Sequence, residues 1–221
     1  MKTVGFIHTA LVLVEVIKKE LSSFSSEMAG FHMVDESLLI DLMKKGQLMP
    51  PVIKRLCQHV VSAEEAGAEI IVVTCSSISP AVDVARKLVN RPVLKIDEPM
   101  AEAAVKMGGR IGILATVATT LEPTSTLLRE KAAESGKSIS LSTALCQEAF
   151  QAVLRGDTER HDQLIIEKGV ELANGVDVVV LAQGSMARMT KLLSQQIKVP
   201  VLSSPSLFAE SLKSMLQALR G

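Results

Sequence analysis

The sequence contains no tryptophan and no tyrosine, and it has only five phenylalanines among 221 residues. Platforms that stack nucleic-acid bases and cages that bind quaternary ammonium groups both need aromatic side chains, so neither is expected. A charge of one sign is also lacking, because 24 Lys and Arg residues balance 24 Asp and Glu residues. Without a basic field or an acidic tail, the chain has no electrostatic signature of a nucleic-acid partner. We therefore expect a small-molecule ligand.

Cysteine is scarce as well, and Cys57, Cys75 and Cys146 have no metal-like spacing. No signal peptide precedes them, so we predict reduced thiols and a cytoplasmic location. The early apolar run ALVLVEVI (10–17) is too short to span a bilayer and includes Glu15. It indicates the buried face of a helix, and no membrane association is expected.

The composition is that of a folded protein, with 48% hydrophobic and 22% charged residues. Strand-like apolar runs alternate with helix-like amphipathic stretches along the chain. The runs are TVGFIH (3–8), EIIVVTC (69–75), PVLKI (92–96), RIGILAT (110–116), SISLS (138–142), DVVVLAQ (177–183) and PVLSS (200–204). Unbroken Val, Ile and Leu runs are typical of parallel strands covered by helices on both faces. The pattern predicts an α/β protein built from βα repeats.

The two halves of the sequence resemble each other. A shift of 108 positions aligns GAEIIVVTCSS (67–77) with GVDVVVLAQGS (175–185) without a gap. The pattern is interrupted near Pro99 and the glycine pair at 108–109. Because the last strand-like run ends at Ser204, the closing helix has no strand left in its own half to follow. We predict one domain from residues 1–98 plus 206–221 and a second from residues 99–205.

Polar residues follow the predicted strands in both halves. Ligands of parallel α/β sheets bind outside the carboxyl ends of the strands, so these residues are the candidate site. The first half offers His8, Thr9, Cys75, Ser76 and Ser77. The second half offers Thr116, Thr119, Thr120, Gln183, Gly184 and Ser185. If the two edges faced each other, they would enclose one cleft.

Cys75 is the candidate with the most reactive side chain. The segment CSSISPAV (75–82) predicts a helix start with Ser76, Ser77 and Ser79 as possible caps and Pro80 in the first turn. Backbone N–H groups and the positive end of a helix dipole would lower the pKa of the thiol and make it a nucleophile or a carbon base. The alternative is a small buried hydrophobic residue. The strand-end position and the duplicated turn favour the reactive thiol.

The doubled layout carries a family resemblance. The turn TCSS (74–77), the matching turn LAQGS (181–185) and the segment GILATVATT (112–120) together resemble the aspartate/glutamate racemase superfamily, over nearly the whole chain. This superfamily also includes hydantoin racemases, maleate isomerases and arylmalonate decarboxylases. The resemblance implies two Rossmann-like α/β domains related by pseudo-twofold symmetry, a cofactor-free active site in the interdomain cleft, and often a homo-oligomer.

The resemblance also implies a chemistry and shows where this chain departs from it. Family racemases use one thiol from each half, because one group removes a proton and another returns a proton on the opposite face. Carried over to this chain, the first thiol is Cys75 and the second falls on Gln183, which cannot exchange a proton at neutral pH. The family's aspartate and serine after the first strand become His8 and Thr9. The resemblance therefore indicates an enzyme with a single cleft thiol.

Three functions remain open from the sequence. The first is a cofactor-independent isomerase, decarboxylase or related lyase that acts on a small carboxylate. In that case Cys75 reacts, His8 holds or activates it, and the threonines, serines and Gln183 turn bind the substrate. The second is a thiol-dependent hydrolase of ester-like substrates, and the third is a non-catalytic protein that binds a small carboxylate. A structural, hydrogen-bonded His8 is an equally good interpretation, and Gln183 could instead cap the following helix.

Other polar residues are assigned structural roles. FHMVDESLL (31–39) contains His32, Asp35 and Glu36, and GDTERHD (156–162) contains Asp157, His161 and Asp162. Neither segment has convincing metal spacing, so solvated loops and caps are predicted, with the first loop able to close over the cleft. Arg188 is predicted to be a surface residue, with carboxylate binding as the alternative. Cys57 is predicted to be in the core, and Cys146 is the rival thiol.

Overall fold

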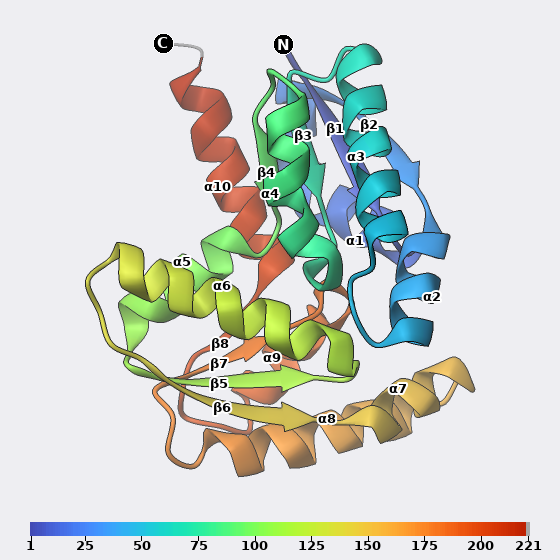
Figure 1. Cartoon of the computed structure of the whole chain (residues 1–221). Coiled ribbons are helices and arrows are strands. Elements are labelled where there is room, and N and C mark those ends of the chain that lie inside the picture. The colour runs from blue at the N-terminus through green and yellow to red at the C-terminus, as the bar shows by residue number, and fades with distance from the viewer. Residues whose placement is uncertain (220–221) are drawn as a thin grey trace. The chain divides into compact units, whose positions relative to one another are not determined.

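The computed structural model describes residues 1–219 and consists of two compact units. Unit 1 comprises Met1–Asp97 and the chain from Pro205 onward, and unit 2 comprises Glu98–Ser204. The chain therefore leaves unit 1, completes unit 2, and returns to unit 1 for its last helix. Figure 1 shows this path by colour, with the red C-terminal helix beside the green strand β4 (Val93–Lys95) of unit 1.

Unit 1 is built on a four-stranded parallel sheet with the strand order β2-β1-β3-β4. Its strands are β1 (Lys2–His8), β2 (Met28–Val34), β3 (Ile70–Val73) and β4 (Val93–Lys95). Its helices are α1 (Val12–Leu21), η1 (Ser22–Glu27), α2 (Glu36–Lys45), α3 (Pro50–Glu65), η2 (Ser76–Ala81), α4 (Val82–Ala85), η3 (Arg86–Leu88) and α10 (Ser204–Ala218), where η marks a 3₁₀ helix.

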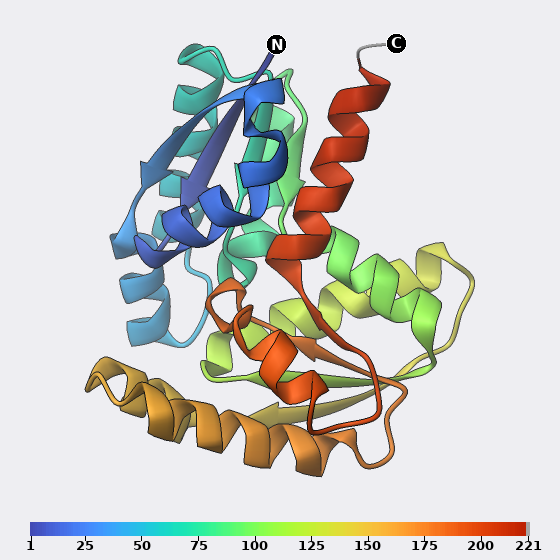
Figure 2. The ribbon, with the colours of Figure 1, turned by 180° about the vertical axis from the view of Figure 1, so that it is seen from behind.

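Both faces of this sheet are buried, which explains the unbroken apolar strand runs. On one face, Ile7, Ile71 and Val73 pack in a cluster with residues of α2, α3 and α4. On the other face the cluster includes Phe6 and Val72 together with residues of α1 and α10. Helix α10 contributes four buried side chains to this second cluster, Phe208, Ala209, Leu212 and Leu216. Figure 2 shows α10 beside the α1 side of the unit 1 sheet.

Unit 2 repeats the same topology, with a parallel sheet in the order β6-β5-β7-β8. Its strands are β5 (Arg110–Ala115), β6 (Ser140–Leu145), β7 (Val178–Leu181) and β8 (Val201–Ser203). Its helices are α5 (Glu98–Met107), η4 (Ala118–Thr120), α6 (Leu121–Glu134), α7 (Gln147–Leu154), α8 (Thr158–Ala173), η5 (Gly184–Met186) and α9 (Met189–Ser194). The α/β class, the parallel sheets and the duplication are confirmed.

The core of unit 2 lies between its sheet and helices α8 and α9. Leu114, Val179 and Leu181 from the strands pack with Ile165 of α8 and Leu193 of α9. Helices α5 and α6 contact each other and contact strands β7 and β5. Both faces of the second sheet are covered as well, so its strands resemble those of unit 1 in sequence.

The glycine pair at 108–109 separates α5 from β5, as the interruption of the sequence pattern suggested. Asp177 lies against this turn and accepts hydrogen bonds from the backbone N–H groups of Gly109 and Arg110. A Cβ atom on Gly108 would lie 2.3 Å from Cβ of Asp177. Residue 108 must therefore be glycine for the carboxylate to approach the backbone so closely.

One predicted loop is wrong. The segment FHMVDESLL (31–39) is the end of strand β2 followed by the start of helix α2, so it is not a loop able to close over a cleft. Strand β2 lies at the edge of its sheet, and most of its side chains are partly exposed. It therefore lacks the unbroken apolar run that identified the central strands.

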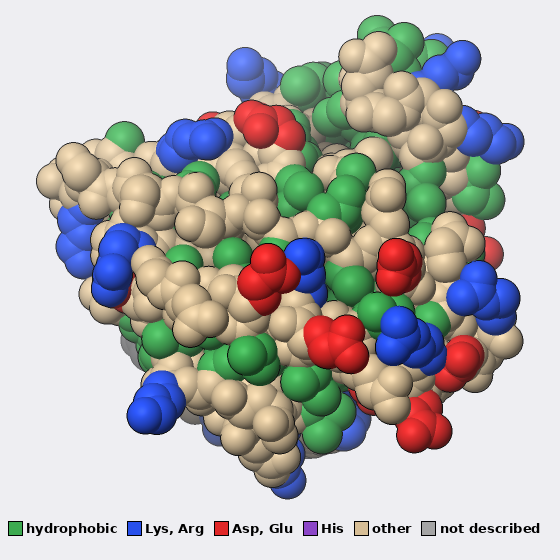
Figure 3. All heavy atoms as spheres, turned by 90° about the horizontal axis from the view of Figure 1, so that it is seen from below, with side chains coloured by type: hydrophobic (Ala, Val, Ile, Leu, Met, Phe, Trp, Pro, Cys, Tyr) green, Lys and Arg blue, Asp and Glu red, His purple; other side chains and the backbone are tan. Residues whose placement is uncertain are grey.

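The surface carries charges of both signs. Figure 3 shows one face on which Lys and Arg side chains alternate with Asp and Glu side chains. This arrangement agrees with the formal net charge of zero. Among the described residues, no helix is both long and apolar enough to cross a membrane.

Candidate active site

Three polar side chains lie in one row beyond the carboxyl edge of the unit 1 sheet. The last paired row of β1, β3 and β4 consists of Ile7, Val73 and Lys95. Two residues further along each strand come Thr9, Cys75 and Asp97. Because side chains alternate between the faces of a strand, the row continues the side of the sheet covered by α2, α3 and α4.

Cys75 is buried, with 9% of the residue exposed, and it packs with Ile78 and Val73. Burial raises the pKa of the Cys75 thiol, and the charge of Asp97 raises it further. The Thr9 hydroxyl and the backbone N–H groups of Ile78 and Ser77 act in the opposite direction, because they favour the thiolate.

The expectation that the turn lowers the pKa of Cys75 is therefore wrong. The residues after Cys75 form a 3₁₀ helix, η2, which makes no side-chain cap hydrogen bond, and α4 has only four residues. Because these two helices are short, the partial positive charge at their N-terminal end is small and stabilises a thiolate only weakly. The desolvation of a buried sulfur outweighs the two backbone donors.

Thr9 and Asp97 each have a buried oxygen atom without a hydrogen-bond partner among the described residues. Thr9 is 2% exposed and Asp97 is fully buried, and the two atoms are Thr9 Oγ1 and Asp97 Oδ2. The Thr9 hydroxyl interacts with the Cys75 sulfur, although without the geometry of a full hydrogen bond. Buried polar atoms are almost always satisfied, so two such atoms in one row with a thiol indicate a functional site.

The serines expected as helix caps bond a carboxylate. Ser79 Oγ donates to Asp97 Oδ1 at 3.0 Å, and the Ser76 hydroxyl also bonds Asp97. Burial raises the pKa of Asp97, while the two serine hydroxyls and the charge of Lys95 lower it. Sequence reasoning missed Asp97, although it follows the predicted strand PVLKI (92–96) at the same carboxyl edge.

His8 is fully buried and belongs to a hydrogen-bonded stack of rings. The Thr74 hydroxyl donates to the Ile7 carbonyl at 3.2 Å, so it accepts from His8 Nδ1 at 2.8 Å. His8 Nε2 then accepts from His32 Nδ1, also at 2.8 Å. Both ring nitrogens of His8 are occupied, so the ring would have to exchange a partner before it could act on Cys75.

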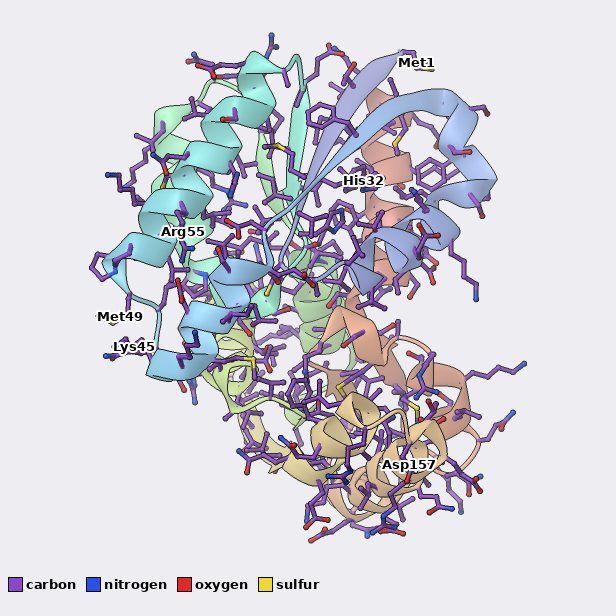
Figure 4. All side chains as sticks on the ribbon, turned by 90° about the vertical axis from the view of Figure 1, so that its right-hand side faces the viewer. Met1, His32, Lys45, Met49, Arg55 and Asp157 are labelled. Carbon is purple, nitrogen blue, oxygen red and sulfur yellow. The ribbon has the colours of Figure 1, made fainter. Side chains whose placement is uncertain are left out.

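The stack also includes Phe6, whose ring centroid lies 6.3 Å from that of His8 and 5.2 Å from that of His32. Burial lowers the pKa of His8 to about 4, and the charge of His32 acts in the same direction. Burial likewise lowers the pKa of His32. His32, which is labelled in Figure 4, comes from strand β2. The contacts of His8 are those of a structural, neutral histidine.

In unit 2 the corresponding row contains Thr116 and Gln183, two residues beyond the paired Leu114 and Leu181. Gln183 Oε1 accepts from the Thr116 backbone N–H at 2.7 Å, and Gln183 Nε2 donates to Thr116 Oγ1 at 2.9 Å. The Thr116 hydroxyl accepts from Gln183, so its own proton points to another partner. Gln183 and Thr116 are therefore in contact in unit 2, just as Cys75 and Thr9 are in contact in unit 1.

The remaining second-half candidates surround this pair. Thr120 is buried and donates to the Val117 carbonyl at 2.5 Å, while Thr119 is partly exposed. Gly184 and Ser185 begin the 3₁₀ helix η5, and Ser185 is exposed. Gln183 precedes this helix but makes no side-chain cap hydrogen bond to it.

Arg188 forms an ion pair within unit 2. Its guanidinium donates to both carboxylate oxygens of Asp162, with Arg188 Nη1 2.7 Å from Oδ2, and His161 Nδ1 lies 2.7 Å from Asp162. Burial raises the pKa of Asp162, but the Arg188 and His161 bonds hold it below its usual range. The expectation of a solvated His161 is wrong, because His161 is 6% exposed.

The predicted capping roles are confirmed for two acidic residues. Asp35 accepts from the Ser37 backbone N–H at the start of α2, and Asp157 accepts from the Arg160 backbone N–H at the start of α8. Asp35 also bonds His59, and Arg55 of α3 bonds Ser37 and Asp41 of α2. Figure 4 labels Arg55 and Asp157 on their elements.

The other two thiols are buried. Cys57 is in the core of unit 1, as predicted, and burial raises the pKa of its thiol. Cys146 precedes α7, is 8% exposed, and lies at the wall of a hollow of about 450 Å³. Burial raises the pKa of Cys146 as well. Within residues 1–219, no group of three or more His, Cys, Asp or Glu side chains is arranged to hold a metal ion.

The duplicated sheet, with a polar row at the carboxyl edge of each copy, defines a class of two-unit α/β proteins. The sequence matches the family described as Asp/Glu/hydantoin racemase over residues 13–212. The chain belongs to this family, which confirms the resemblance read from the turns, and membership of the family supports an isomerase-type enzyme. No curated protein matches the chain in sequence.

Solved racemases share the fold of the whole chain. A glutamate racemase from Francisella tularensis, in complex with D-glutamate, is 14% identical with a TM-score of 0.76, and the match covers 99% of this chain and 82% of that one. An aspartate racemase from Picrophilus torridus is 16% identical with a TM-score of 0.72, covering 98% and 95%. An allantoin racemase from Klebsiella pneumoniae is 16% identical with a TM-score of 0.68, covering 99% and 89%. At these identities the likeness shows the fold alone.

Proposed function

We propose that the protein is a cofactor-independent enzyme that acts on a small carboxylate and uses Cys75 as its single reacting thiol. The observation that carries this proposal is the asymmetry between the two polar rows. In unit 1 the row contains a thiol beside Thr9, whereas in unit 2 the equivalent position is Gln183, bonded twice to Thr116. A glutamine side chain neither gives nor accepts a proton at neutral pH. The expected cleft shared by the two rows stays a prediction.

The proposed reaction delivers a proton to one face of the substrate. The S–H bond of Cys75 breaks and a C–H bond forms at the carbon next to the carboxylate, so the carbanion is quenched and a thiolate remains. The backbone N–H groups of Ser77 and Ile78 and the Thr9 hydroxyl stabilise this thiolate. The carbanion forms in one of two ways. In a decarboxylase a C–CO₂ bond of the substrate breaks and CO₂ leaves, whereas in an isomerase a base other than a thiol removes the proton from the carbon next to the carboxylate. Neither route needs a second thiol.

Unit 2 would then supply binding groups. The Thr116 hydroxyl accepts from Gln183, which leaves its proton free to donate to a carboxylate oxygen. Substrate contacts from Thr119, Thr120, Gly184 and Ser185 are part of the same proposal. His8 is proposed to hold the end of β1 through its bonds to Thr74 and His32, and so to keep the adjacent Thr9 in place.

The test is a screen of small mono- and dicarboxylates in heavy water, in which deuterium uptake, CO₂ release and stereochemical change are followed. On a substrate that turns over, Cys75→Ser is expected to lower kcat on the order of a hundredfold to ten-thousandfold, the usual contribution of a positioned acid or base. Cys146→Ser is the matched control and should keep the wild-type rate. Full turnover by Cys75→Ser would exclude the proposed role.

One observation favours a second candidate function, the binding of a small carboxylate without catalysis. A buried thiol whose pKa is raised is a poor nucleophile, as the thiol of a pure binding protein would be. In that case a carboxylate would raise the melting temperature of the wild-type and Cys75→Ser proteins alike, with no turnover in either. The same raised pKa argues against a thiol-dependent hydrolase, which needs the thiolate as its nucleophile.

The proposal includes the setting of the enzyme. Three reduced cysteines are compatible with a cytoplasmic protein, and a homo-oligomer is proposed by analogy with the family. Neither nucleic acid nor a membrane is proposed as a partner. Sedimentation measurements at several protein concentrations test the oligomer.

A further inference from the structure

Asp97 is the one carboxylate in the row that contains Cys75, and no sequence motif marks it. It follows β4, is fully buried, and accepts the hydroxyl of Ser79 at 3.0 Å through Oδ1. Its second oxygen, Oδ2, has no partner among the described residues. The second half has no counterpart, because the shift of 108 positions places Pro205 there. Both the carboxylate and the thiol are therefore confined to one half.

We infer that Asp97 holds the proton on the sulfur of Cys75 in the resting protein, so that Cys75 acts as a proton donor and not as a nucleophile. Asp97 is in this sense a positioning residue, since it acts on the substrate only through the thiol. The inference deepens the proposed function and depends on it only for the direction in which the proton moves.

The order of the two ionisations decides where the single negative charge resides. In water a carboxyl group ionises about four to five pH units below a thiol. Burial raises the pKa of both Asp97 and Cys75, so it acts on the two groups in the same direction. The carboxylate is favoured further, because Ser76, Ser79 and the charge of Lys95 all stabilise it. The pair therefore has its charge on Asp97 and its proton on Cys75.

A second negative charge beside the first is unfavourable, and this repulsion is what keeps the thiol protonated. When Cys75 gives its proton to a substrate carbanion, the S–H bond breaks, the C–H bond forms, and two negative charges remain in one buried row. The pair then takes up one proton from water, which restores the S–H bond. Asp97 thus makes the thiol a stronger base after each transfer and drives its reprotonation.

The other ionisable groups of unit 1 do not take over this role. Lys95 Nζ lies 2.9 Å from the Asp83 carboxylate of α4, and its positive charge lowers the pKa of Asp97. The charge that raises the pKa of Cys75 is that of Asp97. On the neighbouring strands, His8 and His32 bond each other in their neutral forms. On α2 and α3, Asp35 pairs with His59 and Asp41 pairs with Arg55.

The test is a pH titration of the ultraviolet absorbance of the thiolate. It is made on the full chain in a Cys57→Ala/Cys146→Ala background, with the further variant Cys75→Ser as the blank. Asp97→Asn keeps an oxygen that accepts from Ser79 but removes the charge. We expect it to move the midpoint of Cys75 to lower pH by about one pH unit or more, the effect of losing a like charge at close range.

Glu69→Gln is the matched control, because it makes the same carboxylate-to-amide change at the opposite edge of the sheet, before β3. It should leave the midpoint of Cys75 unchanged. An unchanged or higher midpoint in Asp97→Asn would overturn the inference, as would a wild-type thiol that is ionised at neutral pH.

A second measurement covers the case in which Asp97→Asn does not fold. The carboxyl carbon of Asp97 can be followed by NMR in the wild-type protein, where it should be ionised at neutral pH and titrate below the thiol. A protonated Asp97 at neutral pH would overturn the inference. Both measurements need no substrate, so their failure is distinct from a failure of the catalytic role of Cys75.

Discussion

The buried histidine stack makes the stability of unit 1 depend on pH in a defined direction. His8 is fully buried, and its pKa falls from 6.5 to about 4 in the folded protein. In the unfolded chain the ring takes up a proton near its ordinary pKa of 6.5. Between pH 6.5 and about 4 the unfolded state therefore binds a proton at His8 that the folded state does not bind. The contribution of His8 to stability is fully present above pH 6.5 and is lost as the pH falls towards 4.

The size of this loss follows from the depression of the pKa. The interval from 6.5 to about 4 is about 2.5 pH units. Each unit corresponds to about 1.36 kcal/mol, so roughly 3 kcal/mol of the free energy of unfolding is lost. A loss of this size is a large part of the stability of an ordinary domain.

The perturbation that isolates this effect is His8→Asn, which keeps a side-chain N–H able to reach Thr74 but has no titratable ring. Urea unfolding of both proteins is measured at several pH values from above 6.5 down to about 4. The variant is expected to be less stable at high pH, because it loses the stacked ring. The difference from wild type should shrink by roughly 3 kcal/mol towards the acid end.

Phe6→Leu is the control, because it disturbs the same stack without removing an ionisable group. Its stability curve should run below that of wild type by the same amount at every pH. If the curve of His8→Asn were also parallel to that of wild type, the reasoning about His8 would be refuted.

Two further predictions concern single side chains. Phe208→Ala in α10 removes a side chain that is 2% exposed in the core of unit 1 and should lower the free energy of unfolding by about 3 to 5 kcal/mol in urea titrations. Leu11→Ala, at a site 66% exposed, should change it by less than about 0.5 kcal/mol, and equal effects would contradict the placement of α10. Gln183→Ala removes two hydrogen bonds to Thr116 and should cost about 1 to 3 kcal/mol in stability, and it should raise KM for the substrate more than it lowers kcat. A large fall in kcat at unchanged KM would instead give Gln183 a chemical role.

The fold is predictable because its signal is repeated. The central strands β1, β3, β5 and β7 are buried on both faces, and each has an unbroken apolar run in the sequence. The 108-position shift shows the duplication from the amino-acid sequence alone. Strand β2 escapes detection because it is an edge strand, and its partly exposed side chains have no simple pattern.

The candidate site is predictable in its location and not in its electrostatics. The carboxyl ends of the strands lead to Thr9 and Cys75, because parallel sheets present their ligands there. The predicted direction of the pKa shift of Cys75 is wrong, because it depends on burial, and burial is set by the packing of helices distant in sequence. The length of the helix after Cys75 could not be predicted from the sequence either. The expected helix dipole is weak because η2 and α4 are short.

Asp97 is missed altogether, whereas Cys75 is found but its pKa shift is predicted in the wrong direction. Its strand is identified correctly, and its place at the strand end follows from the same rule that leads to Cys75. A single aspartate between Ile96 and Glu98 looks like an ordinary loop residue. Only the hydrogen bond from Ser79 and the absence of a partner for Oδ2 within the described residues distinguish it.

The return of the chain to unit 1 for helix α10 has a consequence for synthesis. A ribosome releases the N-terminal segment first, yet the hydrophobic cluster beneath α1 still lacks Phe208, Leu212 and Leu216. Unit 2 is contiguous in sequence, so it can fold while one apolar face of the N-terminal sheet is covered by α1 but not yet by α10. The nascent chain is therefore most exposed to aggregation in the interval before α10 emerges, and a truncation that removes α10 would harm the part of the protein that was made first.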